Sequence, residues 1–333
     1  MKKVLVLGAT GAMATYLVPM LLEEGMQVTG VSIDDVSSDH PNLEYVKANA
    51  MDIPFLKAEL AKGYDAVVDF MVYNTKELFE EYYKLFLDNT EHYIFLSTYR
   101  IYAGEYPITE ESLRLLEAEK PEDFVTYKEY SIYKAEEEDM LRGSGYRNFT
   151  IVRPAITYSQ CRFQLTTLEA NVLIYRMLRG KTVVLPEEAM DKEATMSWAG
   201  DVAKMLVAIL FNSKAFGETY TVSTSEHHTW REIAGIYERL GGLKYVTASK
   251  DDFLNIVGGG VASKQQLEYD RFYNRIVDNS KILDLCGMQQ SDLMPLEEGL
   301  RMEYEALNEE KLVRIGCNED VNRRMDEYIE NIK

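Results

Sequence analysis

The chain has 333 residues, 46% of them hydrophobic, and a formal net charge of −19. This length allows one large globular domain or two unequal ones, and the charge argues against a broad electrostatic footprint on nucleic acid or an anionic membrane. The three cysteines are too few and too widely spaced for a disulfide framework or a zinc cluster, and the apolar run Val4–Leu7 is too short for a signal-peptide core. We therefore expect a cytoplasmic protein without a metal site.

The first half of the chain alternates short apolar runs with helical stretches. Val4–Leu7 is wholly apolar, as expected of a parallel strand that is buried on both faces. A helix is predicted over Gly11–Glu24, with Pro19 removing one of its hydrogen bonds. Further strands are predicted at Gln27–Ile33, Leu43–Lys47, Ala66–Val72, Tyr93–Ser97 and Phe149–Arg153, and further helices at Glu77–Leu87 and Thr126–Leu141. The alternation predicts an α/β fold with a Rossmann-type, doubly wound parallel sheet and helices on both faces.

The second half has a looser pattern, typical of a smaller mixed α/β domain that binds substrate. Helices are predicted at Thr167–Arg179, Asp201–Phe211, Trp230–Leu240 and in the charged tail from Pro295, and strands at Thr182–Leu185 and Glu218–Val222. We expect residues 1–156 to form the dinucleotide-binding domain, with 190–224 returning to it, and residues 157–189 and 225–333 to form the substrate domain. The acidic run Glu136–Asp139 is interpreted as a solvated helix face.

The most informative segment is the glycine turn after the first strand. Its spacing, Gly-x-x-Gly-x-x-Ala, runs from Gly8 to Ala14 and opens a helix. Glycines there let the backbone approach a pyrophosphate, and the helix start offers free N–H groups and a positive dipole end. The turn predicts a nucleotide site that includes Gly8, Thr10, Gly11, Ala12 and Met13.

The end of the second strand decides between NAD and NADP. A carboxylate there favours the ribose diol, whereas a basic residue accommodates a 2′-phosphate. Ser32 stands at that position with Asp34 just beyond it, and no Lys or Arg occurs between Lys3 and Lys47. The sequence therefore favours NAD, with Ser32 and Asp34 as ribose-binding residues. The alternative interpretation is that the aspartate only caps the following loop.

Tyr130 and Lys134 are four residues apart in a helical stretch, so they share a face. A lysine ammonium near a phenol favours the phenolate, which could take the proton from a substrate hydroxyl while hydride leaves to the cofactor. This spacing also arises by chance, at Tyr158–Arg162 and Tyr175–Arg179. Tyr130 is selected by its place, on the helix after the fifth strand and downstream of Ser97-Thr98; a packing tyrosine with a surface lysine is the alternative.

These motifs together resemble the extended short-chain dehydrogenase/reductase family, the NAD-dependent epimerases and dehydratases such as UDP-glucose 4-epimerase. Besides the glycine turn and the Tyr130–Lys134 pair, the segment Ser97–Tyr102 is similar to the family's Ser-Ser-x-x-Val-Tyr, and Arg153-Pro154 closes the sixth strand. The similarity runs from Met1 to about Gly242. It implies that Thr98 binds the reacting oxygen, that Lys134 holds the nicotinamide ribose, and that the Tyr130 helix forms a homodimer interface. It further implies cofactor contacts from Asp52, Phe70, Met71, Val72, Ser97, Tyr130, Lys134 and Pro154.

The substrate side departs from the family pattern. Ile156 stands where many sugar-nucleotide epimerases have an asparagine, and Ala194 stands where they have an arginine that binds a diphosphate. Thr98 is followed by Tyr99 and Arg100 rather than the Asp-Glu pair of the dehydratases. Tyr158, Arg162 and Arg176 are candidate substrate residues, and Arg153 is interpreted as structural.

Three functions remain open from the sequence. The first is an NAD-dependent epimerase or oxidoreductase that acts by hydride transfer at a secondary alcohol or ketone of a sugar or sugar-nucleotide-like substrate. The second is an NAD(P)H-dependent reductase of a non-nucleotide carbonyl compound with an exchangeable cofactor. The third is a non-catalytic nucleotide- or RNA-binding protein, since some chloroplast relatives bind stem-loop RNA; the charge of −19 speaks against nucleic acid.

Overall fold

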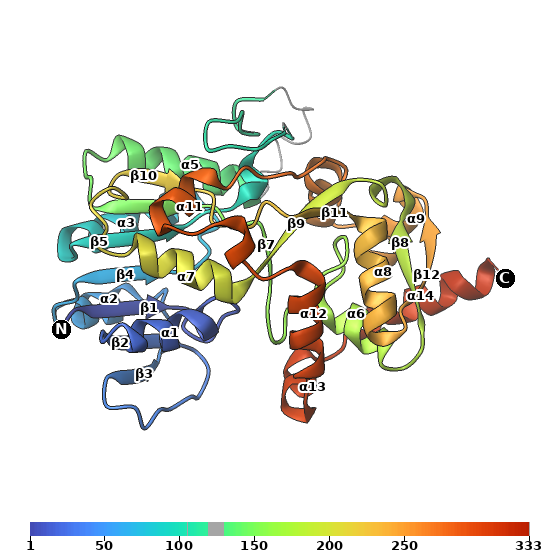
Figure 1. Cartoon of the computed structure of the whole chain (residues 1–333), viewed down its shortest axis with the longest axis horizontal. Coiled ribbons are helices and arrows are strands. Elements are labelled where there is room, and N and C mark those ends of the chain that lie inside the picture. The colour runs from blue at the N-terminus through green and yellow to red at the C-terminus, as the bar shows by residue number, and fades with distance from the viewer. Residues whose placement is uncertain (105, 119–129, 333) are drawn as a thin grey trace.

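The computed structural model describes residues 1–104, 106–118 and 130–332, and it confirms the doubly wound parallel sheet. Seven strands pair in the order β10-β6-β5-β4-β1-β2-β3, all parallel (Figure 1). Their bounds are β1 (Lys3–Leu7), β2 (Gln27–Ser32), β3 (Leu43–Lys47), β4 (Ala66–Asp69), β5 (His92–Leu96), β6 (Phe149–Val152) and β10 (Glu218–Tyr220). The order reverses beside β1, and ligands of such sheets bind at the strand ends where this reversal occurs.

Helices cover both faces of this sheet, which explains its wholly apolar strands. Val4 and Val6 of β1 pack on one side, whereas Leu5 and Leu7 pack on the other. The first face carries α1 (Ala14–Glu23), α7 (Ala199–Ile209) and α11 (Ser280–Cys286), and the second carries α2 (Ile53–Leu60), α3 (Lys76–Asn89) and α5 (Tyr130–Gly143). Within the range 190–224, α7 packs on the large sheet and β10 forms its edge strand, whereas residues 193–198 form a strand of a smaller sheet. α11, which was expected in the substrate domain, also packs against α7.

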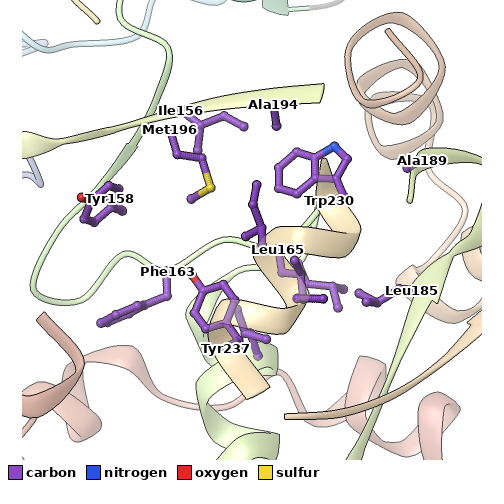
Figure 2. Packing of buried hydrophobic residues seen from close by; sticks show 14 of the residues in the cluster. Ile156, Tyr158, Phe163, Leu165, Leu185, Ala189, Ala194, Met196, Trp230 and Tyr237 are labelled. Carbon is purple, nitrogen blue, oxygen red and sulfur yellow. The ribbon is translucent and has the colours of Figure 1, made fainter. Parts of the chain in front are cut away.

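The second part of the chain is built on two small sheets. One has the order β11-β9-β7 and the other pairs β12 with β8. The strands are β7 (Ile156–Tyr158), β8 (Thr182–Pro186), β9 (Glu193–Trp198), β11 (His227–Thr229) and β12 (Lys244–Ala248). The helices are α6 (Ala170–Met177), α8 (Trp230–Gly241), α9 (Lys250–Val257), α10 (Val261–Gln266), α12 (Leu296–Glu305), α13 (Glu309–Ile315) and α14 (Glu319–Asn331). Figure 2 shows the rings of Trp230 and Tyr237 among the aliphatic side chains of this core.

Three element boundaries differ from the predictions in ways that bear on function. α1 begins at Ala14 rather than Gly11, because Gly11 to Met13 form a turn, with the Gly11 N–H donating to the Gly8 carbonyl at 3.0 Å. β4 ends at Asp69, opposite the last residue of β1, so Phe70 to Val72 leave the sheet at its strand ends. α5 extends to Gly143, and the predicted helical residues 126–129 lie outside the described residues. In the described part of the chain, no helix is long and apolar enough to cross a membrane.

Candidate functional site

The turn between β1 and α1 has the geometry of an anion-binding loop. Gly8 has a φ of 78°, a conformation that favours glycine, and the N–H groups of Gly8 and Ala9 both donate to the Val31 carbonyl at 3.0 Å. A Cβ at position 8 would lie 3.3 Å from the Cβ of Phe70, so only glycine leaves the space between these two segments open. The N–H groups of Thr15, Tyr16 and Leu17 donate to the Gly11 and Met13 carbonyls of the turn. Those of Ala12, Met13 and Ala14 have no acceptor among the described residues and can serve a phosphate.

A cavity of about 530 Å³ lies over this loop, at the carboxyl ends of β1, β2 and β4. Its position and size suit a dinucleotide, since ligand sites of open parallel sheets lie at this edge. Eleven of the predicted cofactor residues line it: Gly8, Thr10, Gly11, Ala12, Met13, Ser32, Asp34, Phe70, Met71, Val72 and Tyr130. The residues that the structure describes therefore fit the cofactor that the sequence predicts.

One end of the cavity carries a small hydrogen-bonded group suited to a ribose. The Thr10 hydroxyl donates to Asp34 Oδ2 at 2.6 Å and lies 2.8 Å from the Ser32 hydroxyl. The Asp34 N–H donates to the same Ser32 oxygen at 3.0 Å. The Asp34 carboxylate is thus held at the wall of the cavity, where it can accept hydrogen bonds from sugar hydroxyls and repel an added phosphate.

Asp52 does not line the cavity. Its side chain accepts a hydrogen bond from the Phe55 N–H at 3.1 Å and caps α2, which is the ordinary use of an aspartate before a helix. Asn49 and Ala50 line the cavity instead. Asn49 lies two residues after the end of β3, and the rule that parallel strands present their carboxyl ends to one site would have singled it out.

A second cavity, of about 340 Å³, adjoins the first, and Met13, Leu96, Tyr130 and Arg162 line both. The predicted residues Ser97, Thr98, Tyr130 and Pro154 all contribute to its wall. Thr98 and Tyr130 therefore share one cavity, and Tyr130 lies where that cavity meets the nucleotide cavity. The Thr98 hydroxyl accepts the Arg100 N–H at 3.3 Å, and the Arg100 guanidinium carbon lies 5.6 Å from the centre of the Tyr130 ring.

The second cavity is rich in arginine. Arg100, Arg162 and Arg271 line it together with Glu169. Arg100 and Arg271 form ion pairs with the buried Asp270, for Arg100 at 3.5 Å. A third arginine, Arg275, donates to Asp270 at 3.0 Å and holds the pKa of that carboxyl low together with Arg271 and Arg100, against the opposing effect of its burial. Three guanidinium groups around one carboxylate leave net positive charge at this end of the cavity.

Lys134 lies beneath the cavities rather than on their walls. The side chain is fully buried, its ammonium is 3.0 Å from Glu137 Oε2, and it lies 4.5 Å from the centre of the Phe95 ring. It lines neither the nucleotide cavity nor the second one. Tyr130 and Lys134 share a helix face as predicted, but Glu137, one turn further along, holds the lysine away from the site.

The interpretation of Glu136–Asp139 as a solvated face is wrong for two of its members, because Glu137 and Glu138 are both 0% exposed. Glu137 lies near Asp69, which accepts hydrogen bonds from the Tyr73 and Tyr93 hydroxyls at 2.9 and 2.8 Å. Burial raises the pKa of Glu137 to about 7, against the attraction of Lys134, and burial also raises the pKa of Asp69.

We expect Glu137→Gln to remove part of the pH dependence of stability. Between pH 4.5 and about 7 the folded protein keeps a proton on Glu137 that the unfolded chain releases, so folding loses up to about 3 kcal/mol as the pH rises through this window. The glutamine variant should lack this loss. Urea unfolding at pH 5, 6, 7 and 8 measures it. Glu136→Gln, on the partly exposed side of α5, is the matched control, and equal slopes in wild type and E137Q would contradict the assignment.

Glu138 has a different role, because it joins α5 to β6 and to the Ser97 segment. Arg153 donates to Glu138 from Nε at 2.8 Å and from Nη2 at 2.6 Å, and the Ser97 hydroxyl donates to the same carboxylate at 2.6 Å. Arg153 also donates to the Tyr102 hydroxyl at 2.8 Å. Arg153 is thus structural, as interpreted from the sequence. The hydrogen bond from Ser97 to Glu138 holds the segment that carries Thr98 against α5.

Two other candidate substrate residues do not reach the site. Arg176 is 1% exposed and donates to the Asn322 and Thr182 carbonyls and to Asp326, which ties α6 to α14. Tyr158 is buried in the core of the second part, away from both cavities. Arg162 alone of the three lines them. Among the described residues, no cluster of three or more His, Cys, Asp or Glu is placed to hold a metal ion.

Comparisons with known proteins agree with this geometry. A family model described as NAD(P)H-binding matches residues 8–213. An epimerase from Methanothermobacter thermautotrophicus has a TM-score of 0.70 at 16% identity, covering 91% of both chains. UDP-glucose 4-epimerase from Thermus thermophilus, solved with NAD, has a TM-score of 0.67 at 17% identity, covering 91% of this chain and 98% of its own.

A curated relative is similar in sequence. It is the chloroplast stem-loop binding protein of 41 kDa b from Arabidopsis thaliana, 26% identical over 257 residues, which are 73% of this chain. The match spans 64% of that relative, less than two thirds of its length. Because the family model covers more than half of this chain, the chain belongs to the NAD(P)H-binding family, and its fold is that of the extended short-chain dehydrogenases/reductases.

Proposed function

We propose that this protein is an NAD-dependent epimerase or oxidoreductase that acts at a secondary alcohol or ketone of a sugar or sugar-nucleotide-like substrate. One observation carries the proposal: Thr98 and Tyr130 line a cavity that opens into the cavity over the phosphate loop. Tyr130, which lines both cavities, and Thr98, which lines the second, would meet a substrate oxygen beside the nicotinamide ring.

The bound nicotinamide would supply the hydride acceptor or donor. The protein's own residues would handle the proton and the substrate oxygen. Thr98 would hold that oxygen by a hydrogen bond. The Tyr130 phenolate oxygen would take the substrate's hydroxyl proton during oxidation, and the resulting phenol would return it during reduction. Arg100, beside the Tyr130 ring, would stabilise the negative charge left on the oxygen.

The charge of the second cavity favours an anionic substrate. Arg162 lines it, and no hydrogen bond or ion pair joins its guanidinium to the described residues, while Arg100 and Arg271 add to its positive field. In a chain of net charge −19, such a cavity would concentrate phosphorylated or carboxylated compounds. UDP-glucose and UDP-glucuronic acid, named for the structural neighbours, are compounds of this kind.

The position of Asp34 supports NAD over NADP. We expect Asp34→Ala to shift the ratio of the two dissociation constants towards NADP by about tenfold or more, because it removes the repulsion of a 2′-phosphate and an acceptor for the ribose diol. Calorimetry with both dinucleotides measures the ratio. Asp35→Ala is the matched control, since Asp35 is exposed and pairs with Lys47 at 2.9 Å. An unchanged ratio in the Asp34 variant would show that another group selects the cofactor.

The first test is the identity of any nucleotide released by heat from the purified protein, followed by calorimetry with NAD and NADP. Stoichiometric NAD would support an epimerase, in which the cofactor is reduced and reoxidised in place. An empty protein that binds NAD and turns over added NADH would favour the reductase. A protein that binds neither dinucleotide would refute the proposal.

Stem-loop RNA is the competing ligand, because the Arabidopsis relative is named for binding it. Phosphate backbones are recognised mainly through cations, and this chain has 36 basic against 55 acidic residues. We therefore expect no salt-sensitive shift of stem-loop RNA in 50 mM salt. A shift that salt abolishes, in a preparation that does not bind NAD, would favour RNA binding over catalysis.

A further inference from the structure

A helix near the end of the chain reaches back to the phosphate loop. Arg314, in α13, donates from Nη2 to the Thr10 carbonyl at 2.7 Å, a contact between residues 304 positions apart. Thr10 lies in the turn whose N–H groups and following helix form the anion-binding loop. A cation from the second part of the chain therefore lies at the loop that is suited to the cofactor's pyrophosphate.

A second arginine approaches the same place from the turn after β7. The Ser159 and Arg162 backbones exchange two hydrogen bonds, at 3.1 and 3.0 Å, which fixes this turn. A cavity of about 150 Å³ at the start of α1 is lined by Thr10, Ala12, Thr15, Ser159, Gln160, Cys161, Arg162 and Arg314. Thr10, Ala12 and Arg162 line the nucleotide cavity as well, whereas Arg314 lines only the small one. The small cavity therefore continues the nucleotide cavity towards α13.

The turn and the helix are also joined to each other. The Cys161 sulfur lies 4.0 Å from the Lys311 carbonyl of α13. Apart from the bond of Arg314 to Thr10, no hydrogen bond or ion pair joins either guanidinium group to the part of the chain that the structure describes. Both groups thus keep free N–H donors beside the loop.

We propose that Arg162 and Arg314 bind the pyrophosphate of the cofactor beside the phosphate loop, and that α13 thereby retains the bound dinucleotide. The proposal rests on the nicotinamide cofactor proposed above. A diphosphate carries two negative charges, and guanidinium groups bind its oxygens through paired, charge-assisted hydrogen bonds. The loop N–H groups, the helix dipole and the two arginines would together neutralise the charge of the diphosphate.

The test is calorimetry with NAD and with ADP, which has the diphosphate but no nicotinamide ribose. In Arg314→Ala and in Arg162→Ala, the dissociation constants of both ligands should rise about tenfold or more, as for the loss of a charge-assisted contact. Adenosine, which has no phosphate, should compete equally well in every variant. Arg323→Ala is the control, because Arg323 pairs with Glu327 at 2.7 Å on α14 and lines none of the cavities above.

Two outcomes would overturn the proposal, and they are distinguishable. If the wild type binds NAD and ADP but the arginine variants bind both as tightly as Arg323→Ala does, the two arginines do not bind the diphosphate, and the cofactor assignment stands. If the wild type binds neither ligand, the cofactor assignment fails and this role fails with it. Melting temperatures of the variants equal to that of the wild type would exclude misfolding. Arg314→Ala is not expected to misfold, because the Arg314 side chain is exposed.

Discussion

Tyr130→Phe is expected to lower kcat for hydride transfer by about a thousandfold, while the dissociation constant of NAD changes by less than about threefold. The substitution removes only the oxygen that would exchange a proton with the substrate, and such proton transfer contributes about a hundredfold to ten-thousandfold to rate. The phenyl ring can keep its place beside Arg100. Single-turnover reduction of NAD, with the most active member of a panel of anionic hydroxy compounds, measures the loss.

Tyr133→Phe is the matched control, because Tyr133 is on the same helix, undergoes the same chemical change and lines neither cavity. It should retain full activity. Thr98→Ala should cost less than Tyr130→Phe, because Thr98 would hold the oxygen without exchanging its proton. If Tyr130→Phe kept the activity of the wild type, the proton would pass through another group, and the catalytic assignment would be wrong.

The parts of the site that lie close together in the sequence were predictable. The phosphate loop is one continuous segment in which strand, glycine turn and helix follow each other, so its geometry depends on local preferences. Ser32 could be found by its offset from the same loop, and Asp34, two residues beyond it, lines the same cavity. Asp52, which the family resemblance implied as a cofactor contact, shows the limit of such a transfer. Asn49, three residues earlier, lines the cavity, whereas Asp52 caps α2 before Ile53-Pro54, an N-cap pattern that the sequence itself contains.

The charges around the second cavity were not predictable, because they come from distant segments. Arg100 follows β5, whereas Asp270, Arg271 and Arg275 lie about half the chain further on, and no periodic pattern links the two. Lys134 illustrates the same limit within one helix. Spacing places it on the face of Tyr130, but the direction of its ammonium depends on Glu137, whose burial follows from packing against the sheet.

Of the strands in the small sheets, the sequence predicted β8 (as Thr182–Leu185) but missed the others for a related reason. β7 and β11 have three residues each, so neither shows a clear alternation, and β7 pairs with β9 across a long stretch of chain. The pairing of such short strands over a long range depends on the core that surrounds them. Trp230, which is 1% exposed, belongs to this core. By contrast, the wholly apolar runs of the large sheet indicate buried parallel strands from the sequence alone.

Arg153→Met is expected to have the largest effect on stability, lowering the free energy of unfolding by about 3–5 kcal/mol. Both partners of the Arg153–Glu138 pair are almost completely buried, so removing the arginine leaves a buried carboxylate without its main counter-charge. The Tyr102 hydroxyl and the Glu110 carbonyl lose a donor as well. Urea unfolding at pH 7 gives the free-energy difference.

Arg142→Met is an internal control for this prediction, because Arg142 approaches the same Glu138 carboxylate, at 3.2 Å, from a side chain that is 38% exposed. Its loss should cost less than about 1 kcal/mol. Replacing both Arg153 and Glu138 by apolar residues should recover part of the stability, since neither charge then stays buried alone. If R153M unfolded like R142M, the pair would contribute little to the fold. If R153M is destabilised as expected, its activity can still be measured under conditions in which the variant is folded. Any loss of activity there would show that the Arg153–Glu138 pair positions Ser97, and with it Thr98, against the helix that carries Tyr130.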